Sequence, residues 1–476
     1  MTLSDYCRHD ATGLADLVRR KEISPRELTA LARAAHEKVD PAINAVVEFY
    51  ADAEDVTGPK EGAFAGVPFL RKDVGAKEAG RLQEYGSRLM QGNVATEDSY
   101  YTTRAKAAGL HYVGRSAVPE FAFAGFTETL LEGITCNPWH PERSAGGSSG
   151  GAAAAVAAGV VPMAHASDGG GSIRIPAGWC GLVGLNPSRG RVSGGPDHQD
   201  SLFGLAREFV VCRTVRDMAA ALDVFSGPEP GDPFIIAQPE RPYRDELQRP
   251  TGKLRIGIAR TAWGRVPIAP DVLAVLDETA KLLADMGHEI EEIASPVNPE
   301  DIMVGVMGGF NLGLAEMPAL AKMLGRPLDA TTMEPVLLKL TEQTLAMSPA
   351  EIVNIFEVMR RIRHAVAIAT ARYDILLTPT TPVTAPPHGL FSTTREDLTA
   401  ADFSEGDTTL FTFLGTFNAT GQPSVSLPLG MSAEGMPVGI QVVGRFADEA
   451  TLVRLARDLE EARPWFDRLP PIHASR

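Results

Sequence analysis

The chain has 476 residues, of which 44% are hydrophobic and 22% charged, the balance of a globular protein rather than a disordered one. Its net charge of −15 comes with no long basic run, which argues against nucleic acid or an anionic membrane as the main partner. The N-terminus lacks the basic start and apolar core of a secretory signal, and the longest apolar run, residues 150–166, is too short to span a membrane and is interpreted as a buried helix.

The four cysteines lie far apart and show no C-x-x-C spacing: Cys7, Cys136, Cys180 and Cys212. This usage is typical of a protein from a reducing compartment, without a disulfide framework or a metal site. We therefore expect a cytoplasmic protein that needs no metal and no cofactor.

The first forty residues predict two helices. Ser24 is placed to cap the second, with Pro25 at its first position and Glu27 closing a capping box. The apolar stretch FAGVPFLRKDVG follows and predicts a buried strand that ends at Lys72 and Asp73. After a glycine stop at residue 109, a short strand is expected over 110–114.

Short β-branched strands separated by helical stretches recur at residues 253–260, 288–294 and 373–382. This alternation predicts an α/β layered fold with a largely buried sheet. The segment 226–253 is dense in proline and glycine, and is interpreted as a surface excursion rather than a domain boundary. Residues 299–372 are expected to be mostly helical and hold many methionines, interpreted as core filler or, alternatively, as an adaptable apolar wall over a substrate pocket.

Two glycine-rich clusters carry serines. Ser148 and Ser149 lie in GGSSGG, and Ser172 lies in SDGGGSIRIP. A serine hydroxyl is a poor nucleophile until a base takes its proton. The nearest histidine, His165, stands in an apolar segment and is interpreted as a core residue, whereas Lys72 at the end of an apolar strand would have its pKa lowered by desolvation and could accept a proton.

Residues 146–177, with the two serines 24 positions apart and the strand-end lysine upstream, closely resemble the signature of the amidase signature family of serine hydrolases. The stretches NATGQPSVSLPLG and GMPVGIQVVG near the C-terminus extend the match. The resemblance implies one amidase domain over 1–476, with a mixed central sheet in α/β/α layers. It further implies a catalytic core over 62–225 and a variable, mostly helical substrate-pocket region over 227–371.

The resemblance also implies a Ser–cisSer–Lys triad, with Ser172 as the nucleophile, Ser148 as the bridging serine in a cis peptide bond, and Lys72 as the base. An acyl-enzyme would form on Ser172, and the backbone N–H groups of Gly169–Gly171 would form the oxyanion hole. Three supporting and three pocket-lining residues are expected as well. The supporting residues are Ser149, bonding within its own loop, and Asp168 and Arg174, holding the nucleophile loop; the pocket residues are Ile175, Trp179 and Cys180, for which a core role is the alternative.

The expected reaction is hydrolysis of a small-molecule carboxamide, and the whole-chain pattern most resembles the branch that opens 6-aminohexanoate cyclic dimers. Aryl-acyl amides, carbamates and esters are alternatives within the family. The amidotransferase A branch is disfavoured because Ile175 is apolar where that branch has a polar residue. An inactive binding protein is disfavoured by the intact triad, and the sequence leaves a homodimer as an open alternative.

An α/β-hydrolase nucleophile elbow at GGSSG is rejected, because the stretch before it is polar and broken by proline rather than a buried strand. Gly169 departs from many relatives, which carry threonine or isoleucine at this position, so the loop is expected to be looser here.

Overall fold

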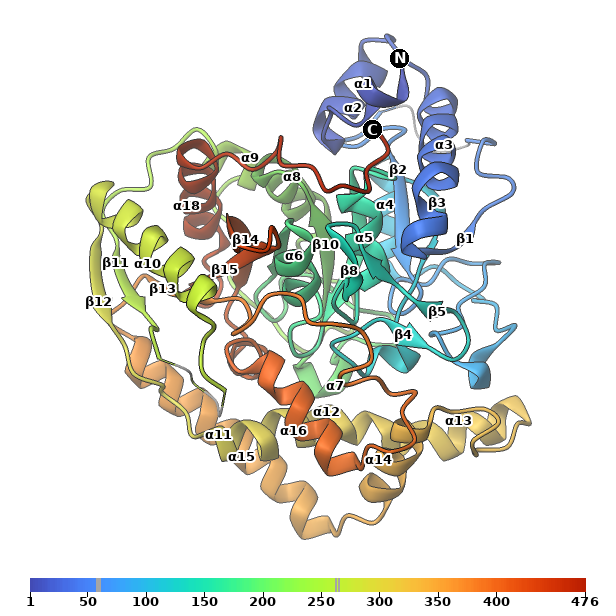
Figure 1. The fold of residues 1–476 in the computed structure, drawn as a ribbon, viewed down its shortest axis with the longest axis vertical. Coiled ribbons are helices and arrows are strands. Elements are labelled where there is room, and N and C mark those ends of the chain that lie inside the picture. The colour runs from blue at the N-terminus through green and yellow to red at the C-terminus, as the bar shows by residue number, and fades with distance from the viewer. Residues whose placement is uncertain (57–60, 262, 264–265) are drawn as a thin grey trace.

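The computed structural model describes residues 1–56, 61–261, 263 and 266–476. Within these residues a mixed sheet of eleven strands runs through the protein in the order β1-β3-β2-β8-β10-β9-β14-β15-β13-β11-β12 (Figure 1). Its strands are β1 Val46–Phe49, β2 Pro68–Lys72, β3 His111–Ser116, β8 Met163–Asp168, β9 Val183–Asn186, β10 Arg207–Cys212, β11 Arg255–Ile258, β12 Glu289–Glu292, β13 Ile375–Pro379, β14 Ser424–Met431 and β15 Pro437–Gly444. Two small hairpins lie outside it, β4 Glu128–Thr129 with β5 Gly133–Ile134, and β6 Cys136–Asn137 with β7 His140–Ser144.

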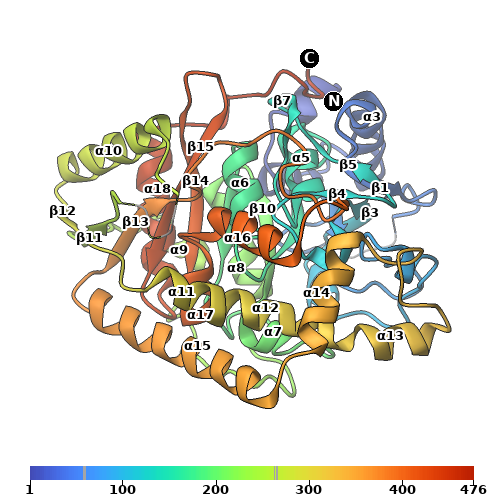
Figure 2. The same ribbon diagram turned by 60° about the horizontal axis from the view of Figure 1, so that its bottom comes forward.

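Helices cover both faces of this sheet, which confirms the predicted α/β/α layering. Helices α5 and α6 pack on one face against β8, β9, β14 and β15, while α4 and α8 lie on the other face and α18 packs on α8 (Figures 1 and 2). The helices of the layers are α1 Leu3–Tyr6, α2 Ala11–Arg19, α3 Pro25–Ile43, α4 Tyr100–Ala107, α5 Gly150–Ala157, α6 Arg174–Cys180, α7 Ser201–Gly204, α8 Val215–Phe225, α9 Tyr243–Glu246, α10 Pro270–Asp285, α17 Gly415–Thr420 and α18 Glu449–Ala462.

The capping signals in the sequence set the start of the long N-terminal helix. Ser24 accepts a hydrogen bond from the Glu27 N–H, and the Glu27 side chain closes the predicted capping box, with Pro25 at the first helical position. The strands expected near residues 110, 255, 290 and 375 are present as β3, β11, β12 and β13. The N-terminal forty residues hold three helices rather than the two predicted, because a short turn of helix, α1, precedes α2.

The interpretation of residues 150–166 as one buried helix is wrong in its second half. Helix α5 ends at Ala157, after which Gly159 adopts a φ of +81° that a helix cannot continue through. Pro162 follows, and the chain then enters strand β8. The whole segment is buried, as expected, but it is a helix that turns back into the centre of the sheet.

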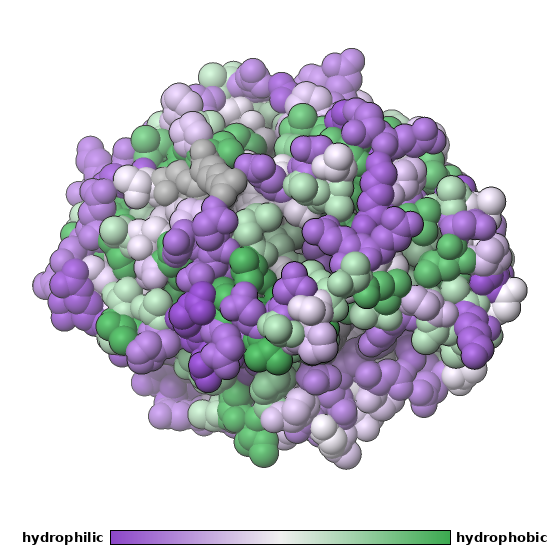
Figure 3. Space-filling model, turned by 90° about the horizontal axis from the view of Figure 1, so that it is seen from below, coloured by the Kyte–Doolittle hydropathy of each residue, from purple (hydrophilic) through white to green (hydrophobic). Residues whose placement is uncertain are grey.

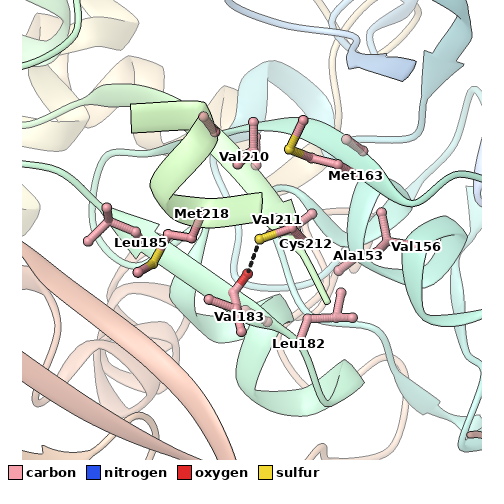
Figure 4. Close-up of a cluster of buried hydrophobic side chains, with 14 of the residues drawn as sticks. Ala153, Val156, Met163, Leu182, Val183, Leu185, Val210, Val211, Cys212 and Met218 are labelled. Carbon is pink, nitrogen blue, oxygen red and sulfur yellow. Dashed lines mark hydrogen bonds between the residues drawn. The ribbon is translucent and has the colours of Figure 1, made fainter. Parts of the chain in front are cut away.

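The main core lies between the sheet and its helical layers. Figure 4 shows part of it, where Cys212 at the end of β10 packs among Val183, Leu185 and Met218. The Cys212 thiol lies 3.9 Å from the Val183 carbonyl, and burial raises its pKa well above the ordinary value. All four cysteines are free, and this one acts as a small apolar side chain.

A second group of helices, most of them in the methionine-rich segment, lies below the sheet in the view of Figure 1 and comes forward in Figure 2. Its members are α11 Pro299–Asp301, α12 Gly308–Asn311, α13 Met317–Leu324, α14 Pro335–Leu345, α15 Pro349–Thr370 and α16 Ala400–Phe411. These helices pack around apolar clusters of their own that include Met317, Met333 and Met359. Polar and apolar side chains are interspersed over the face that they present in Figure 3.

Residues 299–324 are the one stretch in the described part of the chain that is long and apolar enough to span a membrane, with a mean hydropathy of 1.2. Half of its most apolar 18-residue window is buried inside the protein. The stretch is one continuous helix in which a π-helical segment, Ile302–Met307, joins α11 to α12 and a 3₁₀ segment, Leu312–Glu316, joins α12 to α13. Helices packed in the core of a protein meet the same criterion, so this stretch is weak evidence for a membrane span.

Candidate active site

Lys72 is the last residue of β2 and is fully buried. Its Nζ lies 2.8 Å from Ser148 Oγ and 2.9 Å from Ser167 Oγ, so the amine is held between two hydroxyl groups. Burial lowers the pKa of Lys72 to about 7, against the opposing effect of the negative charges on Glu208 and Asp168. Near neutral pH a substantial fraction of this amine is therefore uncharged and able to accept a proton.

The two glycine-rich serine clusters meet beside this amine. The peptide bond between Gly147 and Ser148 is cis. The Ser149 N–H donates to the Ser172 carbonyl at 3.3 Å, so the loop before α5 and the loop before α6 are directly joined. Ser148 and Ser172 are 1% and 5% exposed, yet both line the same cleft.

Ser149 was expected to bond within its own loop, and this is wrong. Its Oγ donates to the Ser167 carbonyl at 3.2 Å and accepts from the Ser167 N–H at 3.3 Å. The side chain thus ties the start of α5 to the end of β8, because the turn before the helix points it toward the sheet rather than toward its own backbone.

Between β8 and α6 the chain makes a glycine turn. Among the described residues, no hydrogen-bond partner is found for the backbone N–H groups of Gly169, Gly170 and Gly171. Gly169 lines the cleft next to Ser172. Backbone N–H groups that lie beside the Ser172 hydroxyl without a partner can stabilise an oxygen on which negative charge develops.

Asp168 and Arg174 bracket this turn and form a fully buried ion pair. Asp168 Oδ1 accepts from Arg174 Nη2 at 2.9 Å, and Oδ2 accepts from Nε at 2.9 Å and from the Ile173 N–H at 3.1 Å. Burial alone would raise the pKa of Asp168, but the Arg174 guanidinium and the Asn418 amide outweigh it and hold this pKa at about 2. The pair closes the turn of residues 169–173 that carries Ser172.

The cleft at Ser172 encloses about 1210 Å³ of space, part of it open to solvent. Aromatic side chains from separate segments pack against each other in its wall, where the Phe123 and Phe310 rings meet edge to face with their centroids 4.6 Å apart. Five non-glycine residues in the cleft wall have φ values between +50° and +63°, in the left-handed region: Tyr85, Phe121, Ala122, Leu202 and Phe203. Such backbone costs free energy and is concentrated at binding and catalytic sites in other proteins.

The expectation that Ile175, Trp179 and Cys180 line the pocket is wrong. These side chains are at most 1% exposed and none borders the cleft. Only the N-terminal end of α6 faces Ser172; the helix then runs into the protein, where Trp179 Nε1 donates to Thr381 Oγ1 at 3.0 Å. Of the methionines in the helical region, Met317 reaches the cleft, together with Phe310, Gly313 and Glu316.

Sequence reasoning missed several residues that contact the candidate site. Ser167 bonds the Lys72 amine, and His165, interpreted only as a core residue, accepts the Lys72 backbone N–H at 3.1 Å. Both stand on one face of β8, at alternate positions just before the glycine turn, and this spacing was the available signal. Asn418 donates to Asp168 from the start of NATGQPSVSLPLG, a stretch matched without any role being assigned to it.

No group of three or more histidine, cysteine, aspartate or glutamate side chains able to hold a metal ion is found in the part of the chain that the structure describes. The chemistry available at the cleft is therefore a buried amine of lowered pKa, two hydroxyl groups within its reach or beside it, and free backbone donors. These groups are suited to nucleophilic attack on a carbonyl carbon.

Comparison with known proteins agrees with this chemistry. The family model described as Amidase matches residues 27–453. The 6-aminohexanoate-cyclic-dimer hydrolase of Paenarthrobacter ureafaciens is 36% identical, over 97% of this chain and 96% of its own length. A solved structure of a 6-aminohexanoate cyclic dimer hydrolase complexed with substrate superposes with a TM-score of 0.92 at 34% identity, covering 98% of this chain and 99% of that one.

A bacterial aryl acylamidase of the amidase signature enzymes superposes with a TM-score of 0.86 at 26% identity, over 96% of both chains. Family model, relatives and solved structures thus agree along nearly the whole length of the chain. The protein belongs to the amidase signature family and is an amidase, a hydrolase of carbon–nitrogen amide bonds.

Proposed function

We propose that the chain hydrolyses a small-molecule carboxamide through an acyl-enzyme on Ser172, with Ser148 as the relay and Lys72 as the base. The observation that carries this proposal is the 2.8 Å contact between the Lys72 amine and Ser148, beside a second serine in the same cleft. The lowered pKa of Lys72 supports a base that is ready near pH 7.

In the first step Ser172 Oγ attacks the substrate carbonyl carbon, and its proton passes to Ser148 while Ser148 gives its own to Lys72. The carbonyl oxygen becomes negatively charged and accepts hydrogen bonds from the N–H groups of Gly169–Gly171, for which the described part of the chain offers no other partner. When the carbon–nitrogen bond breaks, the proton returns through Ser148 to the leaving amine. Water then repeats the sequence on the acyl-enzyme and releases the acid.

We propose a cyclic amide of 6-aminohexanoate as the first substrate to test. Four carboxylates, Asp197, Asp200, Glu208 and Glu316, and no lysine or arginine, are among the described residues that line the cleft. A linear oligomer is a zwitterion, whose terminal carboxylate this lining would repel while it attracts the terminal ammonium group, whereas a cyclic diamide is uncharged and has no carboxylate to place in the cleft. The aromatic wall offers apolar contact to its methylene chains.

Aryl-acyl amides are the second candidate, favoured by the paired rings of Phe123 and Phe310 and by the overlay with an aryl acylamidase. Helices α12 and α13 and the segment between them, all in the variable region 227–371, supply part of this wall and support a role for that region in substrate choice. The catalytic core of residues 62–225 belongs to the same single domain in this proposal. We further propose a cytoplasmic location, because all four cysteines are free thiols.

A substrate panel tests the function. It comprises the cyclic and linear dimers of 6-aminohexanoate, a p-nitroanilide, a carbamate and glutamine, with Ser172→Ala as the blank. We expect kcat/KM for the cyclic dimer to exceed that for the linear dimer by about tenfold or more. Faster hydrolysis of the linear dimer overturns the cyclic assignment, and turnover confined to glutamine overturns the free-standing amidase.

A further inference from the structure

The lysine of the site is held from behind by a chain of two side chains that the proposed reaction does not use. Strand β2 pairs with β8 at a single position, Leu70 with Ala164, and with β3 along its whole length. Beyond that position, the Lys72 backbone N–H donates to the ring nitrogen Nδ1 of His165 at 3.1 Å. The His165 imidazole therefore accepts the Lys72 backbone N–H in place of a carbonyl from the neighbouring strand.

The second link in this chain is Glu208 on β10. Because Nδ1 of His165 accepts a hydrogen bond, the ring proton lies on Nε2, which is 2.5 Å from Glu208 Oε2. His165 is fully buried, and burial lowers its pKa, so the ring is neutral. The carboxylate thus fixes which ring nitrogen is free to hold Lys72.

Space for this carboxylate is provided by a glycine in the loop after Lys72. A Cβ atom at Gly75 would lie 2.5 Å from Glu208 Oε1, and Gly75 has a φ of +88°. Glu208 also borders the cleft, with a side chain that is 13% exposed. The carboxylate therefore lies between the catalytic strand, the loop that follows it and the substrate space.

We propose that His165 and Glu208 are positioning residues for Lys72: they fix the end of β2 so that the amine points between Ser148 and Ser167, and Glu208 places a negative charge near that amine. This inference rests on the proposed function, because it assigns the pair to the base of that reaction. From the sequence His165 was interpreted as a core residue alone, whereas its hydrogen bonds support an additional role in positioning Lys72.

The charge of Glu208 has a direction of effect that can be measured. Burial lowers the pKa of Lys72, while Glu208 and, to a smaller extent, Asp168 raise it. Among the described residues, the amine also contacts the hydroxyl groups of Ser148 and Ser167 and the Ser167 carbonyl, none of which is charged. The neutral ring of His165 bonds the backbone N–H of Lys72, and Asp168 is itself paired with Arg174. Removing the charge of Glu208 while keeping its shape should therefore make Lys72 lose its proton at lower pH.

Two readouts test this, both as a function of pH: amide turnover, and the rate at which phenylmethylsulfonyl fluoride labels Ser172, which needs no amide substrate. In Glu208→Gln a glutamine oxygen can still accept the hydrogen bond from Nε2 of His165, but the negative charge is gone. We therefore expect the acid limb of both profiles, the range in which the rate rises with pH, to move to lower pH by about one unit. His165→Leu removes the ring's hydrogen bonds to Lys72 and to Glu208, and should slow labelling by about tenfold to a hundredfold. His165→Asn keeps an acceptor near the Nδ1 position, so its labelling rate should lie between those of His165→Leu and the wild type. Glu289→Gln, a matched change on the exposed far edge of the sheet, should leave the limb in place.

The results separate the two levels of the proposal. An acid limb that stays at its wild-type pH in Glu208→Gln, with His165→Asn labelled at the wild-type rate, overturns the positioning role and leaves the triad untouched. A wild-type protein whose Ser172 is not labelled at any pH contradicts the proposed function itself. Circular dichroism confirms that each variant is folded, and Glu208→Gln alone decides the question if His165→Leu does not fold.

Discussion

Asp168 and Arg174 stand six residues apart and bind each other through two parallel hydrogen bonds, with neither side chain exposed to solvent. Ser172 lies between them in the chain. The pair therefore sets the shape of the turn that presents the nucleophile. Asn418 of α17 bonds both members, donating to Asp168 and accepting from Arg174, and Gln441 of β15 accepts from Arg174.

Breaking this pair should destabilise the protein strongly. Arg174→Met leaves the Asp168 carboxylate buried without its cation, and we expect the free energy of unfolding to fall by about 3–5 kcal/mol. Urea denaturation measures the change. The exposed pair of Lys253 and Glu289 is the control, since Lys253→Met should cost at most about 1 kcal/mol. A loss of similar size in both variants would contradict the structural role assigned to the buried pair.

The serine clusters and the lysine could be predicted from the sequence because their signals are local. Glycines mark the turns around Ser148 and Ser172, and an apolar strand that ends in Lys72 predicts a desolvated amine. The contact of His165 with Lys72 could not be predicted in this way. It depends on β2 and β8 lying side by side while pairing at only one position, which is a property of the sheet order.

The substrate pocket was the weakest part of the prediction, for a related reason. Ile175 and Trp179 follow the nucleophile closely in sequence, but the direction of α6 takes them into the core. The observed cleft wall comes from segments far apart in the sequence. Part of it has a left-handed backbone at Phe121 and Leu202, where the residue is not glycine and the sequence gives no sign of that conformation. Neither feature has a local pattern that could reveal it.

Activity should rise with pH through the titration of Lys72. Its pKa is lowered by burial to about 7, and only the uncharged amine can take the proton, so kcat/KM should increase about tenfold per pH unit below pH 7 and level off above pH 8. Lys72→Arg keeps a positive charge that cannot be lost and should abolish turnover, as should Lys72→Ala. Wild-type turnover in Lys72→Ala, or a rate that falls steadily from pH 6 to pH 9 with the fold intact, would contradict the assignment of the base.

The two serines should fail in different ways. Ser172→Ala removes the nucleophile, so labelling by phenylmethylsulfonyl fluoride should disappear. Ser148→Ala keeps the nucleophile but removes the relay, and we expect turnover to fall by about 10²–10⁴-fold while slow labelling persists at Ser172. Peptide mass spectrometry locates the adduct. His165→Ala should retain reduced but measurable turnover, and an adduct on Ser148 in the wild type would reverse the two roles.

Turnover should not depend on a metal ion. The described residues contain no cluster of ligands, and the proposed steps use only hydroxyl, amine and backbone groups. Incubation with EDTA followed by gel filtration should leave kcat/KM unchanged. A loss of activity that a divalent cation restores would require a site beyond the one described.

Gly169 should control how closely the aromatic wall approaches the nucleophile. A Cβ atom at this position would lie 2.9 Å from Phe310 Cε2 and 3.0 Å from Leu202 Cδ1, so Gly169→Ala must push the wall into the cleft. We expect KM for bulky amides to rise about tenfold with a smaller change in kcat, because alanine keeps the backbone N–H of residue 169 and leaves Lys72, Ser148 and Ser172 unchanged. Adding Phe310→Leu, which shortens the side chain that is in the way, should restore KM, and a double variant no better than Gly169→Ala would show instead that the substitution acts on the oxyanion turn.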